Sequence, residues 1–185
     1  KHEQGAIHAA DGYARSSGKV GVCFATSGPG AANLITGIAT ANIDSIPIVC
    51  ITGQVATHLI GKDSFQEADV CGITAPVTKH NYLIKKVSDL PRVFKEAFHI
   101  SSTGRPGPVV IDIAKDVFEA EIDFKYPTEV NLRGYKLQKD GNTDDIDTLI
   151  EAVKTAEKPD LFVGGGVISS NTSAYIKQLT EITGI

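Results

Sequence analysis

The sequence begins with a carboxylate at the start of a helical pattern. Glu3 is followed by small and apolar residues at helical spacing, and Gly18 is placed to end that pattern. An acidic residue in the first turn is favoured by the helix dipole, whatever the protein does. Glu3 is therefore either a helix-end charge or a group that handles a proton, and its position alone leaves both interpretations open.

A glycine-rich turn, SGPGAAN, spans Ser27 to Asn33 between an apolar run and an alanine-rich stretch. Gly28 and Gly30 let the backbone approach a ligand closely, and the start of the next helix offers free N–H groups. The pattern is not a dinucleotide-binding fingerprint, because Asn33 stands where the third glycine would be. The turn is a candidate ligand contact, with a plain strand-to-helix connection as the alternative.

Three further segments carry candidate groups. The irregular run 59–69 includes Phe65 and Gln66, which also suit a packing ring and a surface amide. Lys115 follows an apolar run, at the strand end where open parallel sheets bind ligands, although it also suits a solvent-facing lysine. The glycine run 164–166 lies between an apolar stretch and a helical pattern and resembles a phosphate-binding turn, although its expected acidic partner falls at or past the last residue.

The elements that must position these groups alternate between strand-like and helix-like patterns. Helices are expected over residues 3–16, 31–42, 88–102, 142–156 and 170–183, with Ser88 as an N-cap. Strands are expected in VGVCFAT, IPIVCIT, PVVIDI and LFVGGG. This alternation predicts an α/β fold, a parallel sheet with helices on both faces. After Val117 the sequence becomes polar and aperiodic, which indicates a linker before a second α/β unit.

Composition excludes several classes of function. The net charge of −4 and the scattered basic residues argue against a nucleic-acid partner. No apolar run approaches the roughly 18 residues that a membrane span needs. The three cysteines lack CxxC spacing, and Cys23 and Cys50 lie in apolar runs, so we expect reduced, buried thiols and a cytoplasmic location. No metal cluster, carboxylate pair or serine–histidine–acid set is apparent.

Taken together, the order and spacing of four motifs resemble those of a known enzyme family. KHEQGAIHAADGYAR, TSGPGAANLITGIATANIDSIPIVCITGQ, IGKDSFQE and TGRPGPVVIDIAKDV occur in this order and resemble the large catalytic subunits of acetolactate synthase (acetohydroxyacid synthase), a thiamine diphosphate-dependent family. The resemblance is dense over residues 1–117 and looser beyond. It implies a pyrimidine-binding domain over 1–118 that lacks its first strands, a linker over 119–141, and the start of a central, FAD-associated Rossmann-like domain over 142–185.

The resemblance also implies roles for individual residues. Glu3 would contact N1′ of the aminopyrimidine of thiamine diphosphate and favour the tautomer that removes the thiazolium C2 proton, from an apolar pocket that raises its pKa. Gln66 and Lys115 would act in catalysis, with Phe65 and Lys115 also contacting substrate. The resemblance assigns further cofactor contacts to Ser27, Pro29, Asn33 and Gln66 for thiamine diphosphate, and to Ser45, Arg105, Gly164, Gly165 and Gly166 for FAD.

The implied reaction joins two 2-keto acids with loss of carbon dioxide, making 2-acetolactate from pyruvate and also using 2-ketobutyrate as acceptor, the first common step of branched-chain amino acid biosynthesis. Mg²⁺ would be held through a GDG motif, which does not occur in this sequence. Relatives imply a homodimer or homotetramer with the active site at the subunit interface, and a small regulatory subunit as a further partner. We expect this chain by itself to be inactive.

Two alternatives stay open at this stage. One is another thiamine diphosphate enzyme, of the pyruvate oxidase or sulfoacetaldehyde acetyltransferase type, because such enzymes share elements like those around Glu3 and Gln66. The other is a non-catalytic nucleotide-binding module that reuses the fold. The continuous ITGQV and TGRPGPVVIDIAKDV segments favour acetolactate synthase over both.

Overall fold

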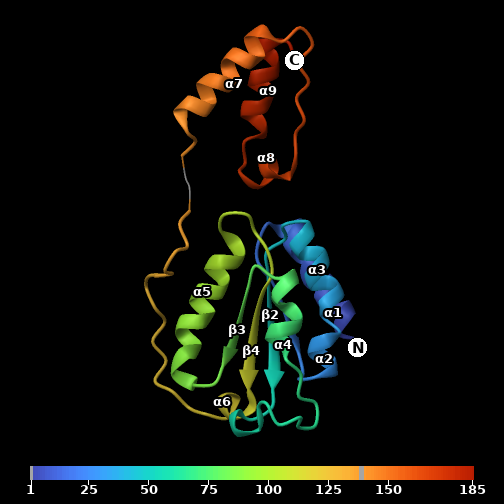
Figure 1. Ribbon diagram of the computed structural model, residues 1–185, viewed down its shortest axis with the longest axis vertical. Coiled ribbons are helices and arrows are strands. Elements are labelled where there is room, and N and C mark those ends of the chain that lie inside the picture. The colour runs from blue at the N-terminus through green and yellow to red at the C-terminus, as the bar shows by residue number, and fades with distance from the viewer. Residues whose placement is uncertain (1, 138–139) are drawn as a thin grey trace. The chain divides into compact units, whose positions relative to one another are not determined.

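Four parallel strands form the sheet that organises the first part of the chain, as Figure 1 shows. Their order across the sheet is β1-β2-β4-β3. The bounds are β1 (Gly21–Ala25), β2 (Ile48–Gln54), β3 (His80–Ile84) and β4 (Val109–Ala114). The predicted α/β class with a parallel sheet is confirmed. The computed structural model describes residues 2–137 and 140–185, so Lys1 of the KHEQ motif and residues 138–139 of the predicted linker lie outside the described residues.

Helices connect these strands and continue after them. The longer helices are α1 (Glu3–Ser17), α3 (Ile35–Ile43), α5 (Leu90–Ser102), α7 (Thr143–Thr155) and α9 (Ser173–Thr183). The shorter ones are α2 (Pro29–Ala32), α4 (Val70–Thr74), α6 (Lys115–Phe118) and α8 (Gly165–Ser169), with 3₁₀ turns η1 (Thr57–Leu59), η2 (Ala75–Val77) and η3 (Val87–Asp89). The predicted first helix is confirmed: His2 caps its start through Nδ1, and Gly18 ends it with a φ of 68°.

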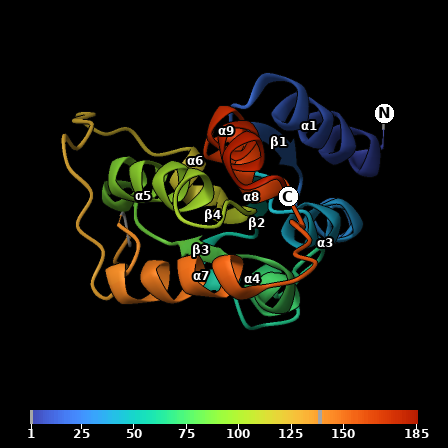
Figure 2. The same ribbon diagram turned by 90° about the horizontal axis from the view of Figure 1, so that it is seen from above.

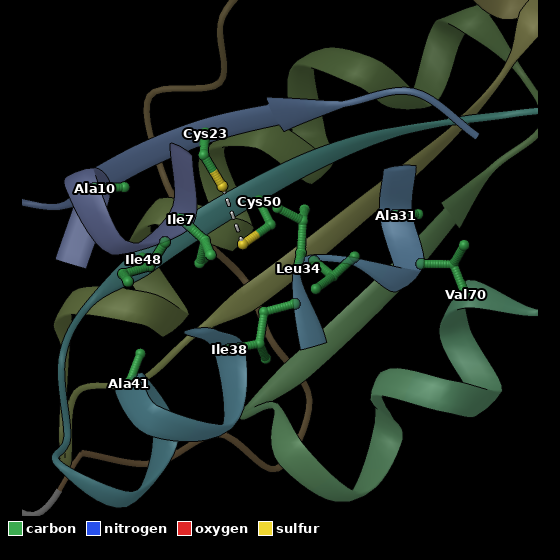
Figure 3. Packing of buried hydrophobic residues seen from close by; sticks show 11 residues of the cluster. Ile7, Ala10, Cys23, Ala31, Leu34, Ile38, Ala41, Ile48, Cys50 and Val70 are labelled. Atoms are coloured by element: carbon green, nitrogen blue, oxygen red, sulfur yellow. Dashed lines mark hydrogen bonds between the residues drawn. The ribbon is translucent and has the colours of Figure 1, made fainter. Parts of the chain in front are cut away.

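Apolar side chains cover both faces of the sheet, because successive residues of a strand point to opposite sides. On one face, side chains of α1, α2, α3 and α4 pack on Cys50 of β2 and Val110 of β4 (Figure 3). On the other face, α5 and α6 pack on Ile51 of β2 and Ile111 of β4, and the view in Figure 2 separates these two layers. Cys23 and Cys50 are buried, free and in contact across the β1–β2 register, as their apolar context predicted.

Several predicted boundaries are wrong. The helix expected over 31–42 is broken at Asn33 and Leu34 into α2 and α3, and this break leaves Asn33 free to face α1. Ser88 is not an N-cap but lies within the turn η3, while Asp89 is the N-cap of α5, one residue later, and Pro91 lies in the first turn of that helix. The strand β3 was not predicted, because its sequence HNYLI is only half-buried at the sheet edge.

The chain divides into two units, Lys1–Leu137 and Gln138–Ile185. In the second unit, α7, α8 and α9 contain no buried residue. The strand predicted in LFVGGG is wrong, since residues 161–164 form no strand and Gly165 begins α8. A single apolar segment needs a neighbouring strand to satisfy its backbone groups, and none is described in this unit. Within residues 2–137 and 140–185, no helix has the length and apolar character needed to cross a bilayer.

Candidate functional site

Four segments of the first unit meet at the carboxyl edge of the sheet. The SGPG turn follows β1, the segment 55–69 follows β2, and α6 follows β4, so the shared strand direction carries all three to one edge. The start of α1 lies at the same edge, because Glu3 contacts Asn33 at the end of α2. This is the edge at which open parallel sheets bind ligands.

The Glu3 carboxylate is paired with an amide from the turn. Asn33 Nδ2 donates to Glu3 Oε2 at 3.0 Å. The other oxygen, Oε1, faces Gly30, where an added Cβ would lie 3.6 Å from it. The hydrogen bond from Asn33 is the main cause that lowers the pKa of Glu3. The expected rise in this pKa is therefore wrong for this chain, because the carboxylate is half-exposed and accepts a hydrogen bond that favours its charged form.

Gly28 brings the SGPG turn into backbone contact with the segment 55–69. Its φ of 59° and ψ of −115° suit glycine alone, and an added Cβ would lie 2.6 Å from the carbonyl oxygen of Gln66. Gln66 itself has a φ of 60°, and the neighbouring Phe65 side chain is 89% exposed. The structure thus brings the backbone of Gln66 beside the turn that carries Asn33, while Ser27 is half-buried and Pro29 is exposed in the same turn.

A buried polar cluster anchors the end of this segment to the sheet. Asp112 of β4 accepts from Thr52 Oγ1 at 2.6 Å and from Gln54 Nε2 at 2.9 Å. Gln54 Nε2 also donates to the carbonyl of Ala68 at 2.7 Å, and its Oε1 accepts from the N–H of Val55 at 2.8 Å. Burial raises the pKa of Asp112 to about 6, although the hydrogen bonds from Thr52 and Gln54 oppose that rise.

The start of the same segment is attached to α6. Asp116 Oδ1 accepts from both the N–H and the Oγ1 of Thr57, each at 2.9 Å, and the N–H bond is the main cause that lowers the pKa of Asp116. Lys115 precedes it as the first residue of α6, directly after β4. Its Nζ forms a long ion pair with Glu119 Oε1 at 3.8 Å, and its side chain is 70% exposed, so this pair at the carboxyl edge is weak.

The sequence interpretation missed the residues that hold this edge together. Gln54, Asp112 and Asp116 were quoted within motifs but given no role. A carboxylate inside the apolar run PVVIDI was the available signal, since a buried charge needs partners nearby. The identity of those partners depends on the β2–β4 register, which pairs Thr52 with Asp112.

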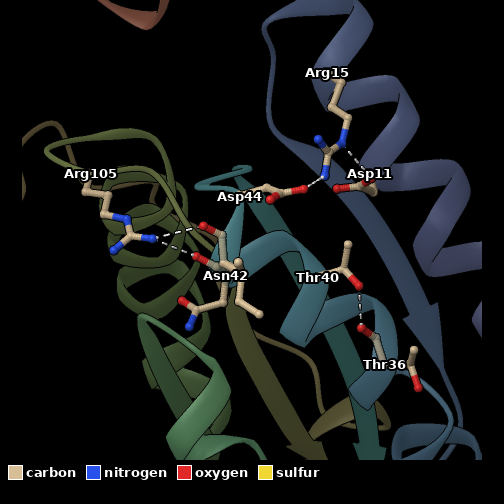
Figure 4. A network of polar contacts seen from close by, with 8 residues as sticks. Asp11, Arg15, Thr36, Thr40, Asn42, Asp44 and Arg105 are labelled. Atoms are coloured by element: carbon tan, nitrogen blue, oxygen red, sulfur yellow. Dashed lines mark hydrogen bonds and ion pairs between the residues drawn. The ribbon is translucent and has the colours of Figure 1, made fainter. Parts of the chain in front are cut away.

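The candidate FAD residues lie elsewhere. Ser45 and Arg105 meet at the opposite, amino edge of the sheet, where Arg105 Nε donates to Ser45 Oγ at 2.7 Å. The Arg105 guanidinium also donates to the carbonyls of Asn42 and Ile43 at 3.3 and 3.0 Å, as Figure 4 shows, and so caps the C-terminal end of α3. The third group, Gly164 to Gly166, lies in the second unit at the start of α8.

Comparison with known proteins agrees with this geometry. The family described as "Thiamine pyrophosphate enzyme, N-terminal TPP binding domain" matches residues 1–73, which include Glu3, the SGPG turn and Gln66. The acetolactate synthase large subunit of Corynebacterium glutamicum is 52% identical over 185 residues, all of this chain and 30% of that protein. The acetolactate synthases of Mycobacterium leprae and Arthrospira platensis are 53% and 54% identical, over 100% and 98% of this chain and 30% and 32% of those proteins.

The matched model and the parallel α/β fold show that residues 1–73 belong to an N-terminal domain of the thiamine pyrophosphate enzymes. Within that class, the chain is similar along its whole length to acetolactate synthase large subunits, which confirms the resemblance expected from its motifs. The chain spans about 30% of the length of these relatives.

The residues at the carboxyl edge fit one end of thiamine diphosphate. Glu3 Oε1 has no hydrogen-bond partner among the described residues and can accept one from a ring N–H. Phe65 and Gln66 expose an aromatic ring and an amide at the same edge of the sheet. Among residues 2–137 and 140–185, no three His, Cys, Asp or Glu side chains form a group that could hold a metal ion.

Proposed function

We propose that this chain forms the pyrimidine end of the thiamine diphosphate site in an enzyme that condenses two 2-keto acids with decarboxylation, as an acetolactate synthase. The observation that carries the proposal is the Glu3 carboxylate, held through one oxygen by Asn33 while the other faces Gly30. It gains weight from the relatives named acetolactate synthase that are 52–54% identical to the chain.

The geometry defines what Glu3 does. The hydrogen bond from Asn33 fixes the carboxylate and lowers its pKa, so Glu3 is ionised near neutral pH and its Oε1 can accept a hydrogen bond from a ring N–H. A bound ring that covers this half-exposed group would exclude water and strengthen that hydrogen bond. Thiamine diphosphate, when bound, supplies the electron sink for decarboxylation and transfer of the two-carbon unit.

The remaining candidate residues have roles that follow from their places at the same edge. Gln66 lies beside the turn and presents an amide that can orient a 2-keto acid, with Phe65 forming an apolar wall next to it. Lys115 adds a positive charge at the end of β4, suited to a substrate carboxylate. We assign pyruvate and 2-ketobutyrate as substrates on this basis.

The proposal extends to cofactors and assembly. Mg²⁺ would be bound by residues outside this chain together with the cofactor diphosphate, and FAD would contact Ser45, Arg105 and the glycines 164–166. The active protein would be a homodimer or homotetramer whose sites lie between subunits, with a small regulatory subunit as a partner. Residues 1–118 would act as the pyrimidine-binding domain, 119–141 as the linker, and 142–185 as the start of the central domain.

A chimera tests the proposed function. In it, this chain replaces the matched 185-residue segment of the Corynebacterium glutamicum relative. Glu3→Gln keeps the size of the side chain but removes its charge, and we expect kcat to fall about 10²- to 10⁴-fold, the range for loss of a group that handles a proton. The assay measures acetolactate formed from pyruvate with thiamine diphosphate, Mg²⁺ and FAD.

Glu121→Ala is the matched control, because Glu121 is an exposed carboxylate in the segment after α6. It should leave kcat within about twofold, since isolated surface substitutions have small effects. An active chimera in which Glu3→Gln retains full turnover would contradict the role of Glu3. A chimera that makes a product other than acetolactate would favour another thiamine diphosphate enzyme.

A further inference from the structure

The segment 55–69 makes a tight turn that lacks regular backbone pairing. Three residues of this turn, Gly61, Asp63 and Gln66, have φ values of 82°, 54° and 60°. Left-handed residues cannot continue a helix or a strand, so the N–H groups of such a turn need partners of another kind. Whatever satisfies those N–H groups also fixes the backbone of Gln66.

One carboxylate supplies these partners. Glu67 Oε1 accepts from the N–H of Gly61, and its Oε2 accepts from the N–H of Ser64 at 2.9 Å and from the N–H of Lys62 at 3.3 Å. The N–H of Glu67 donates back to the carbonyl of Ser64 at 2.9 Å. The carboxylate and three amides thus close the turn from inside, as charge-assisted hydrogen bonds to backbone N–H groups do elsewhere.

The two ends of the segment are attached separately. Thr57 is bonded to Asp116 of α6, and Ala68 is bonded to Gln54 of β2. Neither contact reaches the middle of the turn, where Gln66 lies with its carbonyl against Gly28. Among the described residues, the side-chain hydrogen bonds that hold this middle part come from Glu67 and from Ser64, whose Oγ donates to the carbonyl of Leu59 at 3.2 Å.

We propose that Glu67 is a positioning residue, whose carboxylate closes the 61–67 turn and holds Gln66 in the left-handed conformation that seats it against the SGPG turn. Glu67 acts through the backbone, and its own carboxylate is occupied by the three amides. The inference rests on the proposed function only for its effect on turnover. Its effect on the turn itself is independent of any reaction.

Amide hydrogen exchange of this chain tests the structural part. In Glu67→Ala, the amides of Gly61 and Ser64 should exchange at least about tenfold faster, because they lose their acceptor. The Lys62 amide should change less, because it also donates to the carbonyl of Leu59 at 3.2 Å. Glu67→Gln should give a smaller increase, since one amide oxygen can still accept. The amides of β2 and β4 report whether the sheet stays folded, and Glu121→Ala is the control. Unchanged exchange at the Gly61 and Ser64 amides in Glu67→Ala would overturn the proposal.

Kinetics of the chimera test the positioning part. Glu67→Ala should lower kcat about 10- to 100-fold, the cost of a small misplacement of a reacting group, while KM for thiamine diphosphate changes less than about threefold because Glu3 and Asn33 are untouched. Glu67→Gln should restore part of kcat. A loss of stability would also lower apparent kcat at unchanged KM, because fewer molecules are folded, so kcat is divided by the folded fraction that the β2 and β4 amides of the same chimera report.

The outcomes separate the two proposals. Faster exchange with unchanged kcat, in a chimera that Glu3→Gln inactivates, would overturn the positioning role while leaving the proposed function intact. Full activity of Glu3→Gln would overturn the proposed function, and the exchange experiment alone would then decide whether Glu67 holds the turn.

Discussion

The two units of the chain differ in how many of their side chains are buried. In the first unit, both faces of the four-stranded sheet are covered, and side chains such as Ile111 of β4 and Leu34 before α3 are fully buried. In the second unit, no described residue is buried, and Phe162 is 99% exposed. Regular helices alone do not make a core, because the stability of a fold comes from burying the apolar faces of its helices.

This difference bears on the two sets of candidate cofactor residues. The candidate thiamine diphosphate residues lie at one edge of a packed sheet, where Glu3, Asn33 and Gln66 are set by contacts within one unit. The candidate FAD residues are divided between Arg105, which caps α3, and glycines of the second unit. The described fold brings the first set together at one edge, and the roles of both sets remain predictions from the resemblance.

Truncating a large apolar side chain in each unit should give the largest difference between the two units in the loss of stability. Ile111→Ala removes a buried side chain and should lower the free energy of unfolding of the first unit by about 2–5 kcal/mol. Leu149→Ala in α7, where the side chain is 63% exposed, should change the stability of the second unit by less than about 0.5 kcal/mol. Native-state amide exchange of β2 and α7 measures each unit separately. Equal effects would mean that the second unit has a core of its own.

Removing the buried charge should have the next largest effect. The pKa of Asp112 is raised to about 6 from 3.8, so the folded state binds more protons than the unfolded state between these values. Stability therefore falls as pH rises from about 4 to 7, by up to about 3 kcal/mol from this group. Asp112→Asn should remove that slope, measured by amide exchange of β4 across this range.

The matched control for the buried charge lies in the second unit. Asp147→Asn changes an exposed carboxylate of α7 and should leave the pH dependence of the first unit as it was. A slope that persists in Asp112→Asn would assign the pH dependence to other groups. Asp69 is the charged neighbour that adds to the rise in the pKa of Asp112, so it would be the next group to change.

Substitution of one glycine in each unit, Gly28 and Gly164, should give the smallest difference in stability between the two units. Gly28→Ala places a Cβ 2.6 Å from the carbonyl oxygen of Gln66 at a φ of 59°, and should cost about 1–3 kcal/mol and loosen the segment 55–69. Gly164→Ala has nothing within 4 Å and should change stability by less than about 0.5 kcal/mol. Thermal unfolding and amide exchange of residues 61–64 measure both. Intact exchange in Gly28→Ala would show that the turn and the segment move independently.

Much of the fold could be predicted because the central strands have a recognisable sequence pattern. PVVIDI and IPIVCIT are apolar on both faces, as buried parallel strands must be, and they became β4 and β2. HNYLI was missed because an edge strand is covered on fewer sides and carries polar residues. LFVGGG was misread as a strand because an apolar run alone does not show whether a partner strand is present.

The candidate site was predictable in its members but not in its connections. Glu3, Asn33 and Gln66 were chosen from motifs, yet their hydrogen bonds and the lowered pKa of Glu3 follow from which side chains the fold brings together. Glu67 appeared in the sequence as one more charge in a loop. Its three backbone partners exist only because the turn folds back on it.

The sequence by itself determined the α/β class, the match of residues 1–73 to thiamine pyrophosphate enzymes and the residues of the SGPG turn, because hydrophobic periodicity and ordered motifs are properties of the linear chain. Tertiary structure alone decided the strand order, the pairing of Asp112 with Thr52 and Gln54, and the meeting of Gly28 with Gln66. These contacts join residues 38 to 60 positions apart, and their partners are fixed by strand register and close packing, which no local pattern encodes.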